Sequence, residues 1–96
     1  MKITAKDTLA LQAQGATVLD VRTVEEYAAG HLPGAINLPL DALMEAPYYA
    51  PDHKKPVVVY CASGERSGRA AAVLTAGGWE KVYDMGAISN WKYGLE

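Results

Sequence analysis

The sequence predicts an α/β fold: a small, mostly parallel, five-stranded sheet with helices on both faces. Short apolar runs alternate along the chain with stretches that carry helix-start and helix-stop signals. This alternation is typical of a parallel sheet whose crossover helices cover both sides. The chain has 96 residues, which suffices for one compact domain and is too short for two. The expected organisation is therefore a single domain over residues 1–96.

The strands are expected where apolar runs are short and bounded by turn or helix signals. They are Lys2-Ile3, Thr17–Val21, Ala35–Leu38, Pro56–Tyr60 and Lys81–Tyr83. Pro56–Tyr60 is β-branched and unbroken, which indicates the centre of the sheet. Thr17–Val21 is typical of a strand buried on both faces. Lys2-Ile3 is so short that we expect it at an edge.

The helices are expected between these strands. They lie at residues 4–15, 23–30, 42–46 and 66–76, with a helical turn within residues 88–93. The first two begin with capping boxes at Thr4 and Thr23 and end at glycine. Asp41 is expected to cap the third helix. Pro47–Lys55 holds two prolines and several polar residues, so we interpret it as a loop.

Composition excludes several classes of partner. The formal net charge is -2 and there is no Lys/Arg run, which argues against nucleic acid and against a polybasic membrane patch. No stretch approaches the ~20 apolar residues of a membrane span. The start lacks a signal-peptide pattern, so we expect a cytoplasmic protein, or a periplasmic one if a signal was removed. The closing Leu95-Glu96 resembles the scar that precedes many purification tags.

The chain has one cysteine, Cys61, so it can form no intramolecular disulfide. Composition alone favours a small buried hydrophobe over a reactive thiol. The position of Cys61 favours a reactive thiol, because it directly follows the strongest predicted strand and precedes a predicted helix. Ligands of open α/β sheets bind beyond the carboxyl ends of the strands.

The loop after Cys61 has the features of an anion-binding nest. Ala62, Ser63 and Gly64 are small enough for a tight turn whose amides point inward, and a helix N-terminus follows. The same N–H groups and the helix dipole favour a thiolate and lower a thiol pKa. Arg66 adds a positive charge. We therefore interpret Cys61 as a nucleophile rather than a structural cysteine.

The chain resembles the rhodanese family over nearly its whole length. The resemblance rests on three groups of motifs in the family's order. They are Asp20–Tyr27 with Gly30-His31 and Pro33–Asn37, then Cys61–Ser67, and finally Gly77–Trp79 with Val82–Asp84. The family's sulfurtransferases have a six-residue loop counted from the cysteine, here Cys61 to Arg66. Related phosphatases and arsenate reductases place the arginine one residue later, where this chain has Ser67.

The resemblance implies a thiosulfate sulfurtransferase with Cys61 as its catalytic residue. A donor such as thiosulfate would load Cys61 with sulfur, and cyanide or a thiol would remove it. The substrate-binding residues would be Ala62, Ser63, Gly64, Glu65, Arg66 and Ser67. No cofactor or metal is implied, and the two histidines are far apart in sequence. Two alternatives remain: a persulfide-carrying module that docks a protein acceptor, and a phosphatase or arsenate reductase with a shortened loop.

Several polar residues have two interpretations. Arg66 could balance the charge of an anionic substrate, or lie on the helix surface. Ser67 could donate to the thiolate or cap the helix. Glu65 should repel thiosulfate unless it faces solvent. Asp20 and Arg22, near Glu25 and Glu26, and also His31, are interpreted as structural. We expect a monomer whose partners are a small sulfur-containing anion and a thiol, cyanide or protein acceptor.

Overall fold

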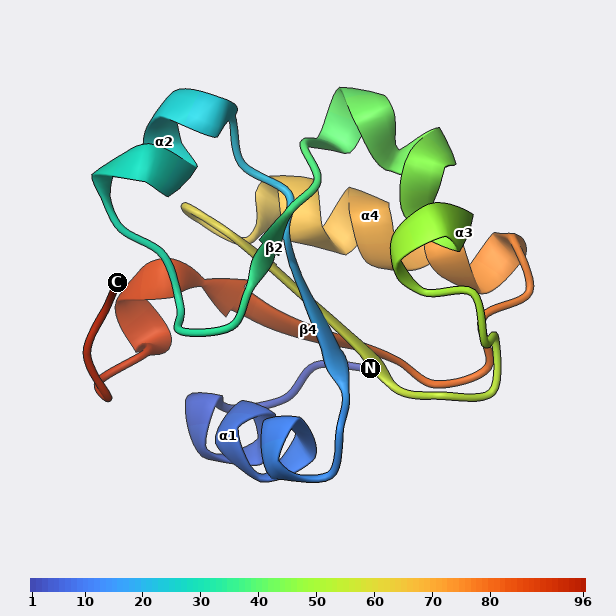
Figure 1. The fold of residues 1–96 in the computed structure, drawn as a ribbon, viewed down its shortest axis with the longest axis horizontal. Coiled ribbons are helices and arrows are strands. Elements are labelled where there is room, and N and C mark those ends of the chain that lie inside the picture. Colours follow the sequence, from blue (N-terminus) through green and yellow to red (C-terminus); the bar gives the residue numbers. More distant parts are fainter.

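The computed structural model describes all 96 residues and contains one parallel sheet between two layers of helix (Figure 1). In chain order the elements are α1 (Ala5–Ala13), β1 (Thr17–Asp20), α2 (Val24–Ala29), β2 (Ile36–Asn37), the 3₁₀ helix η1 (Leu40–Glu45), α3 (Ala46–Tyr49), β3 (Val57–Cys61), α4 (Glu65–Ala76), β4 (Val82–Ala87) and the 3₁₀ turn η2 (Ile88–Asn90). No helix combines the length and the apolar character needed to cross a bilayer.

The sheet has four strands in the order β2-β1-β3-β4, and all neighbours are parallel. The predicted fifth strand is wrong. Lys2 forms only an isolated bridge to Asp84 beside β4. The reason is local: Thr4 already caps α1 by accepting the N–H of Asp7, so the chain turns away after Ile3.

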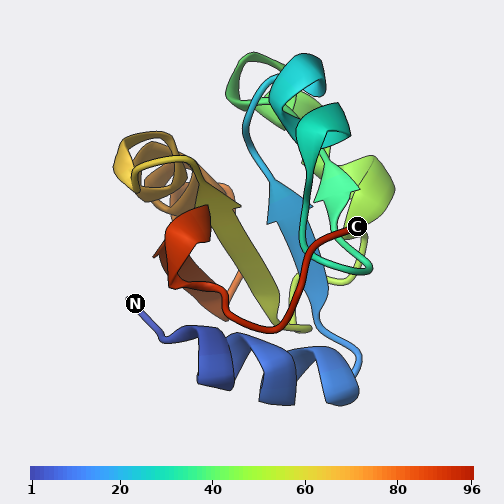
Figure 2. The same ribbon diagram turned by 90° about the vertical axis from the view of Figure 1, so that its left-hand side faces the viewer.

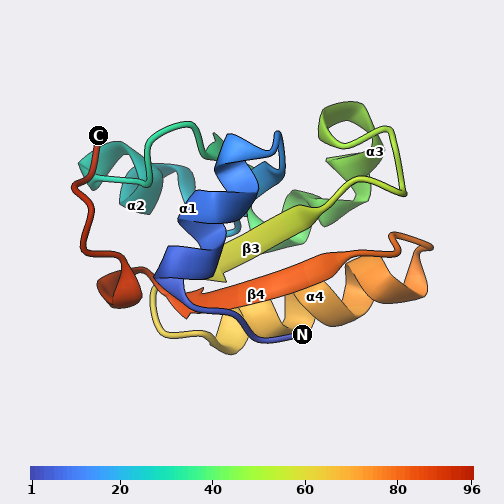
Figure 3. The same ribbon diagram turned by 90° about the horizontal axis from the view of Figure 1, so that it is seen from below.

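Helices cover both faces of the sheet, as predicted (Figures 2 and 3). The strands β1 and β3 alternate between two hydrophobic clusters because successive side chains of a strand point to opposite faces. On β3, Val57, Val59 and Cys61 join the cluster that includes α4 residues, whereas Val58 and Tyr60 join the cluster that includes α1. This alternation decides which face of the sheet Cys61 occupies.

The segment after β2 differs from the prediction. Asp41 caps no helix; a 3₁₀ helix begins at Leu40 instead, after Pro39. It continues into α3, so residues 47–49 of the predicted loop are helical. Pro47 is tolerated there because the first turn of a helix leaves its N–H groups without intrahelical partners. The Leu40 N–H donates to the Val21 carbonyl at 3.2 Å, a tertiary contact that fixes where this segment begins.

The last strand is longer than predicted and runs from Val82 to Ala87. Asp84 and Gly86 break the apolar pattern, and a register shift interrupts its pairing with β3 between Val59 and Tyr60. The Gly86 N–H donates to Asp84 Oδ1 at 2.8 Å, so the carboxylate satisfies a backbone group at this irregularity. Because Asp84 and Gly86 interrupt the apolar run, the hydrophobic pattern of the sequence predicts only the first half of β4.

A buried polar network joins β1 to β3. The Tyr60 hydroxyl donates to Asp20 Oδ2 at 2.6 Å, and the Arg22 guanidinium donates to the same carboxylate at 2.7 Å. The Tyr60 oxygen in turn accepts the Leu32 N–H at 3.1 Å. Burial, with a further contribution from Asp20, raises the pKa of Tyr60 well above its ordinary value. The structural role predicted for Asp20 and Arg22 agrees with these contacts.

Candidate active site

Cys61 is the last residue of the central strand β3 rather than the first residue after it. Its backbone pairs with Ala87 of β4, and on the other side β1 ends beside it. The side chain points to the α4 face and is fully buried. Cys61 therefore lies at the carboxyl edge of the sheet, where a parallel α/β fold positions its ligands.

The chain leaves β3 through a short turn that directs N–H groups at the sulfur. Ala62 and Ser63 are exposed, and Gly64 has a φ of 97°, a left-handed conformation that glycine adopts without steric cost. The Gly64 N–H donates to Cys61 Sγ at 2.9 Å, and the Ser67 N–H donates to it at 3.3 Å. These two N–H groups point at the sulfur, and α4 begins directly after Gly64.

The environment of Cys61 contains opposing effects on its pKa. Burial raises the pKa of the thiol, because a thiolate is poorly solvated in the interior. Hydrogen bonding with the Ser67 side chain, together with the N–H groups of Ser67, Gly64 and Ser63, lowers it by more, so the pKa of Cys61 lies below its ordinary value. Cys61 is thus a buried cysteine with a thiolate-stabilising surrounding.

Ser67 contacts both the sulfur and the helix start. Its oxygen lies 3.5 Å from Cys61 Sγ, and its hydroxyl donates to the Gly64 carbonyl at 3.2 Å. The side chain is fully buried. The capping role considered for Ser67 is wrong, because Gly64 is the N-cap of α4, no side chain caps this helix, and the Ser67 hydroxyl donates to a carbonyl instead of accepting an N–H. The role of Ser67 toward the thiolate stays a prediction.

Arg66 extends from the first turn of α4 to α2. Its guanidinium donates to both carboxylate oxygens of Glu26, at 2.6 and 3.0 Å. Hydrogen bonding to Arg66, aided by the Thr23 N–H, lowers the pKa of Glu26 to about 2. The sequence indicated a network around Glu26 but gave no sign of this partner. The role of Arg66 toward an anionic substrate stays a prediction.

Glu65 faces away from the sulfur. Its side chain is 74% exposed and accepts a hydrogen bond from Arg69, four residues along α4, at 3.1 Å. The repulsion of thiosulfate considered for Glu65 is therefore weakened by solvent and by Arg69. His31 stacks on Tyr27 and bonds to its carbonyl, which agrees with a structural role.

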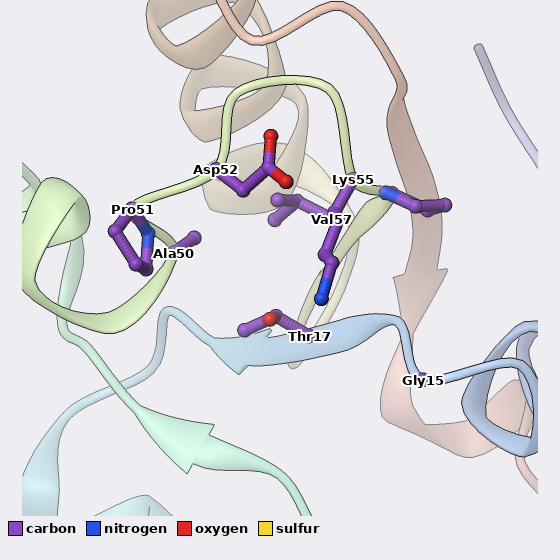
Figure 4. A pocket seen from close by; sticks show the side chains of 8 residues that line it. Gly15, Thr17, Ala50, Pro51, Asp52, Lys55 and Val57 are labelled. Atoms are coloured by element: carbon purple, nitrogen blue, oxygen red, sulfur yellow. The ribbon is translucent and has the colours of Figure 1, made fainter.

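Two hollows bear on where a substrate can bind. The pocket in Figure 4 has a volume of about 170 Å³ and includes Thr17 and Val57, the first residues of β1 and β3. It lies at the amino end of the sheet, opposite Cys61. An open groove of about 370 Å³ lies instead beside Arg66, and its walls include Val21 and Leu40.

The fold and this cysteine-centred loop define a class, an α/β domain that presents a stabilised thiol at the edge of a parallel sheet. The model of the rhodanese-like domain matches residues 4–93. A thiosulfate sulfurtransferase GlpE of Pseudomonas entomophila is 37% identical over 92 residues, which cover 95% of this chain and 84% of that protein. The thiosulfate sulfurtransferase PspE of Escherichia coli is 38% identical over 73 residues, 75% of this chain and 70% of that one.

Solved structures agree with this relationship. An E. coli rhodanese with anions superposes with a TM-score of 0.82 at 31% identity, over 85% of this chain and 98% of that one. The human single-domain sulfurtransferase TSTD1 gives a TM-score of 0.80 at 28% identity, over 95% and 92%. The chain belongs to the rhodanese family. The resemblance seen in the sequence is confirmed, and so is the class of enzyme it implies, a sulfurtransferase.

Proposed function

We propose that this protein transfers a sulfane sulfur through a persulfide on Cys61, with thiosulfate as a competent donor. The observation that carries the proposal is the pair of N–H groups, from Gly64 and Ser67, that donate to Cys61 Sγ at the N-terminus of a 12-residue helix. Such donors stabilise negative charge on sulfur before and after it is loaded. Two relatives that carry the name thiosulfate sulfurtransferase support the choice of donor.

The first step loads the cysteine. The Cys61 thiolate attacks the outer sulfur of thiosulfate, a sulfur–sulfur bond forms to Cys61, and the bond to the sulfonate breaks. Sulfite leaves with the electron pair, so no external oxidant or reductant is needed. The N–H groups from Ala62 to Ser67 are the donors available to the outer sulfur of the persulfide. Because Ala62 and Ser63 are exposed, the donor approaches from this loop.

The second step discharges the persulfide. A nucleophile attacks the outer sulfur, the bond to Cys61 breaks, and Cys61 leaves as a thiolate. Cyanide gives thiocyanate and a thiol gives a new persulfide. The same N–H groups that stabilise the attacking thiolate in the first step stabilise the leaving thiolate in the second. One loop therefore serves both halves of the cycle.

Intact-mass measurement tests the proposal directly. We expect incubation with thiosulfate to add one sulfur, and cyanide to remove it with formation of thiocyanate. Cys61→Ala, checked for folding by circular dichroism, should take up no sulfur. Phosphatase turnover without sulfur uptake would contradict the proposal and favour the phosphatase alternative. Sulfur uptake with slow discharge to every small acceptor would favour the module that docks a protein acceptor.

A further inference from the structure

An open groove runs beside the Cys61 loop. It has a volume of about 370 Å³, at the lower end of the range for small-molecule sites. Its walls come from the segment after β1, from the start of η1 and from α4. They are formed by Val21, Thr23, Pro39, Leu40, Asp41 and Arg66.

The floor of this groove is next to Cys61. Val21 lies one residue beyond the pair Asp20–Tyr60 of β1 and β3, and its N–H donates to the Tyr60 carbonyl at 3.1 Å. Val21 and Cys61 belong to the same hydrophobic cluster, and Leu40 packs against that cluster. A molecule seated in the groove therefore contacts side chains of the same cluster as Cys61, with Arg66 of the active-site loop as one wall.

The uncompensated charge in the groove is negative. Arg66 is paired with Glu26 through two hydrogen bonds, and this pair carries no net charge. Asp41 is exposed and takes part in none of the ion pairs of the chain. It lines the groove together with the apolar residues Pro39 and Leu40. Such a site suits a ligand with a short apolar body and one positive charge.

We propose that this groove binds the sulfur acceptor, and that Asp41 selects small thiols that carry an ammonium group. The inference rests on the proposed function, because it assigns the acceptor side of the same cycle. The methylene groups of the acceptor lie against Val21 and Leu40, and its ammonium group pairs with Asp41. Its thiolate attacks the outer sulfur of the Cys61 persulfide, a bond forms between those two sulfurs, and Cys61 leaves with the electron pair as a thiolate.

Discharge of the sulfur-loaded protein by two matched thiols tests this selection. Cysteamine carries an ammonium group where 2-mercaptoethanol carries a hydroxyl, and the ratio of their rates cancels effects on loading. We expect Asp41→Asn to lower the cysteamine preference about two- to fivefold, the range of an exposed ion pair, and Asp41→Lys to lower it further. The preference should also shrink at about 1 M salt, where the screening length falls to about 3 Å.

Glu80→Gln is the matched control variant. It removes the same charge from an exposed residue near the amino end of β4, on the side away from Cys61. The cysteamine preference of Glu80→Gln should equal that of the unaltered protein. An unchanged preference in both Asp41 variants, or an equal change in the control, overturns the proposal.

A second measurement separates this proposal from the proposed function. The unloaded thiol is treated with methanethiosulfonates that carry an ethylammonium or an ethylsulfonate group, which requires no sulfur transfer. We expect Asp41→Lys to lower the cationic-to-anionic rate ratio and Glu80→Gln to leave it unchanged. If Asp41→Lys lowers this ratio but the protein takes no sulfur from thiosulfate, the role of Asp41 in the groove is supported and the donor step of the proposed function is contradicted. If the protein loads sulfur but neither the cysteamine preference nor the methanethiosulfonate ratio changes in the Asp41 variants, the groove proposal is overturned and the proposed function stands.

Discussion

The Arg66 guanidinium donates to both carboxylate oxygens of Glu26, at 2.6 and 3.0 Å, and joins two helices whose residues are 40 positions apart. Glu26 also accepts the Thr23 N–H at 2.9 Å and so belongs to the capping box of α2. The Glu26 carboxylate therefore caps the N-terminus of α2. It also neutralises Arg66, the only charged side chain of the Cys61 loop that lines the groove. The pair bears on how the site receives an anion.

Replacing Glu26 with glutamine should improve the use of thiosulfate. The variant keeps a capping-box residue at the third helical position but removes the charge that neutralises Arg66. A freed guanidinium attracts the thiosulfate dianion, and we expect KM for thiosulfate to fall about two- to fivefold, the range of an exposed pair. Steady-state thiocyanate formation at fixed cyanide measures this change.

Glu65→Gln is the matched control for this experiment. It removes the same charge from the residue before Arg66, but that carboxylate is 74% exposed and pairs with Arg69. Its KM should therefore stay within about twofold of the original value, because solvent screens it from the donor. Equal falls in the two variants would show a general surface-charge effect and would contradict a specific role for Glu26.

The same ion pair should contribute to stability in a pH-dependent way. The pKa of Glu26 is lowered from 4.5 to about 2, chiefly by Arg66. Since the folded protein holds the carboxylate charged, the contribution is fully present above pH 4.5 and is lost as the pH falls toward about 2. Its size is below about 1 kcal/mol, because the side chains are about a third exposed and solvent screens them.

Urea unfolding of the protein and of Glu26→Gln, at several pH values between about 6 and about 3, checks this expectation. The difference in unfolding free energy between the two proteins should be constant at the upper end and shrink toward the lower end. A difference that is independent of pH would mean that the charge of Glu26 stabilises nothing.

Ser67 should lower the pKa of the nucleophile. Ser67→Ala removes the hydroxyl near Cys61 Sγ but retains the N–H that donates to it. Because that hydroxyl lowers the pKa of Cys61, its loss should raise the pKa and leave less thiolate at neutral pH. The rate of Cys61 alkylation by iodoacetamide, measured as a function of pH, should have its inflection at a higher pH in Ser67→Ala. In alkaline solution the rate of the variant should equal that of the unaltered protein.

Ser63→Ala is the comparison for Ser67→Ala. Ser63 contributes its backbone N–H to Cys61, while its side chain is exposed, so the alanine variant keeps that donor. Its inflection should coincide with that of the unaltered protein. If the inflection of the alkylation rate of Ser67→Ala does not move, the Ser67 hydroxyl bonds to the turn before α4 but does not lower the pKa of Cys61.

Local signals explain which parts of this fold the sequence could predict. The capping boxes at Thr4 and Thr23 are formed by residues three positions apart, and both are present as predicted. The strand that ends in Cys61 is an unbroken β-branched run followed by small residues and a helix, so its place in the sheet was predictable. Each of these features depends on neighbours in the chain.

The features that the sequence did not predict depend on tertiary contacts. The position of η1 follows from the bond between the Leu40 N–H and the Val21 carbonyl, which no local pattern indicates. The pairing of Glu26 with Arg66 requires the topology of the sheet before the two helices can meet. Only after that pairing is known does Asp41 stand out as the uncompensated charge of the groove. The acceptor side of the site was therefore beyond sequence reasoning.

Gly64→Ala should impair both stability and sulfur loading, and the two effects can be separated. At a φ of 97° an alanine is strained by about 1–2 kcal/mol. The new Cβ would lie 3.7 Å from the Gly86 Cα, an ordinary contact, so the strain arises from the backbone. Relaxation of that strain moves the Gly64 N–H away from the sulfur, and we expect loading by thiosulfate to slow about tenfold, as for loss of one hydrogen bond to a charged group.

Gly15→Ala provides the control because Gly15 has a φ of 92° and no atom within 4 Å of the added Cβ. It lines the pocket at the amino end of the sheet, far from Cys61. Urea unfolding should show a similar loss of stability in the two variants, and intact-mass kinetics should show slow loading in Gly64→Ala alone. Equal loading rates would mean that the Gly64 N–H does not stabilise the charge that develops on sulfur, and the role assigned to the turn would be wrong.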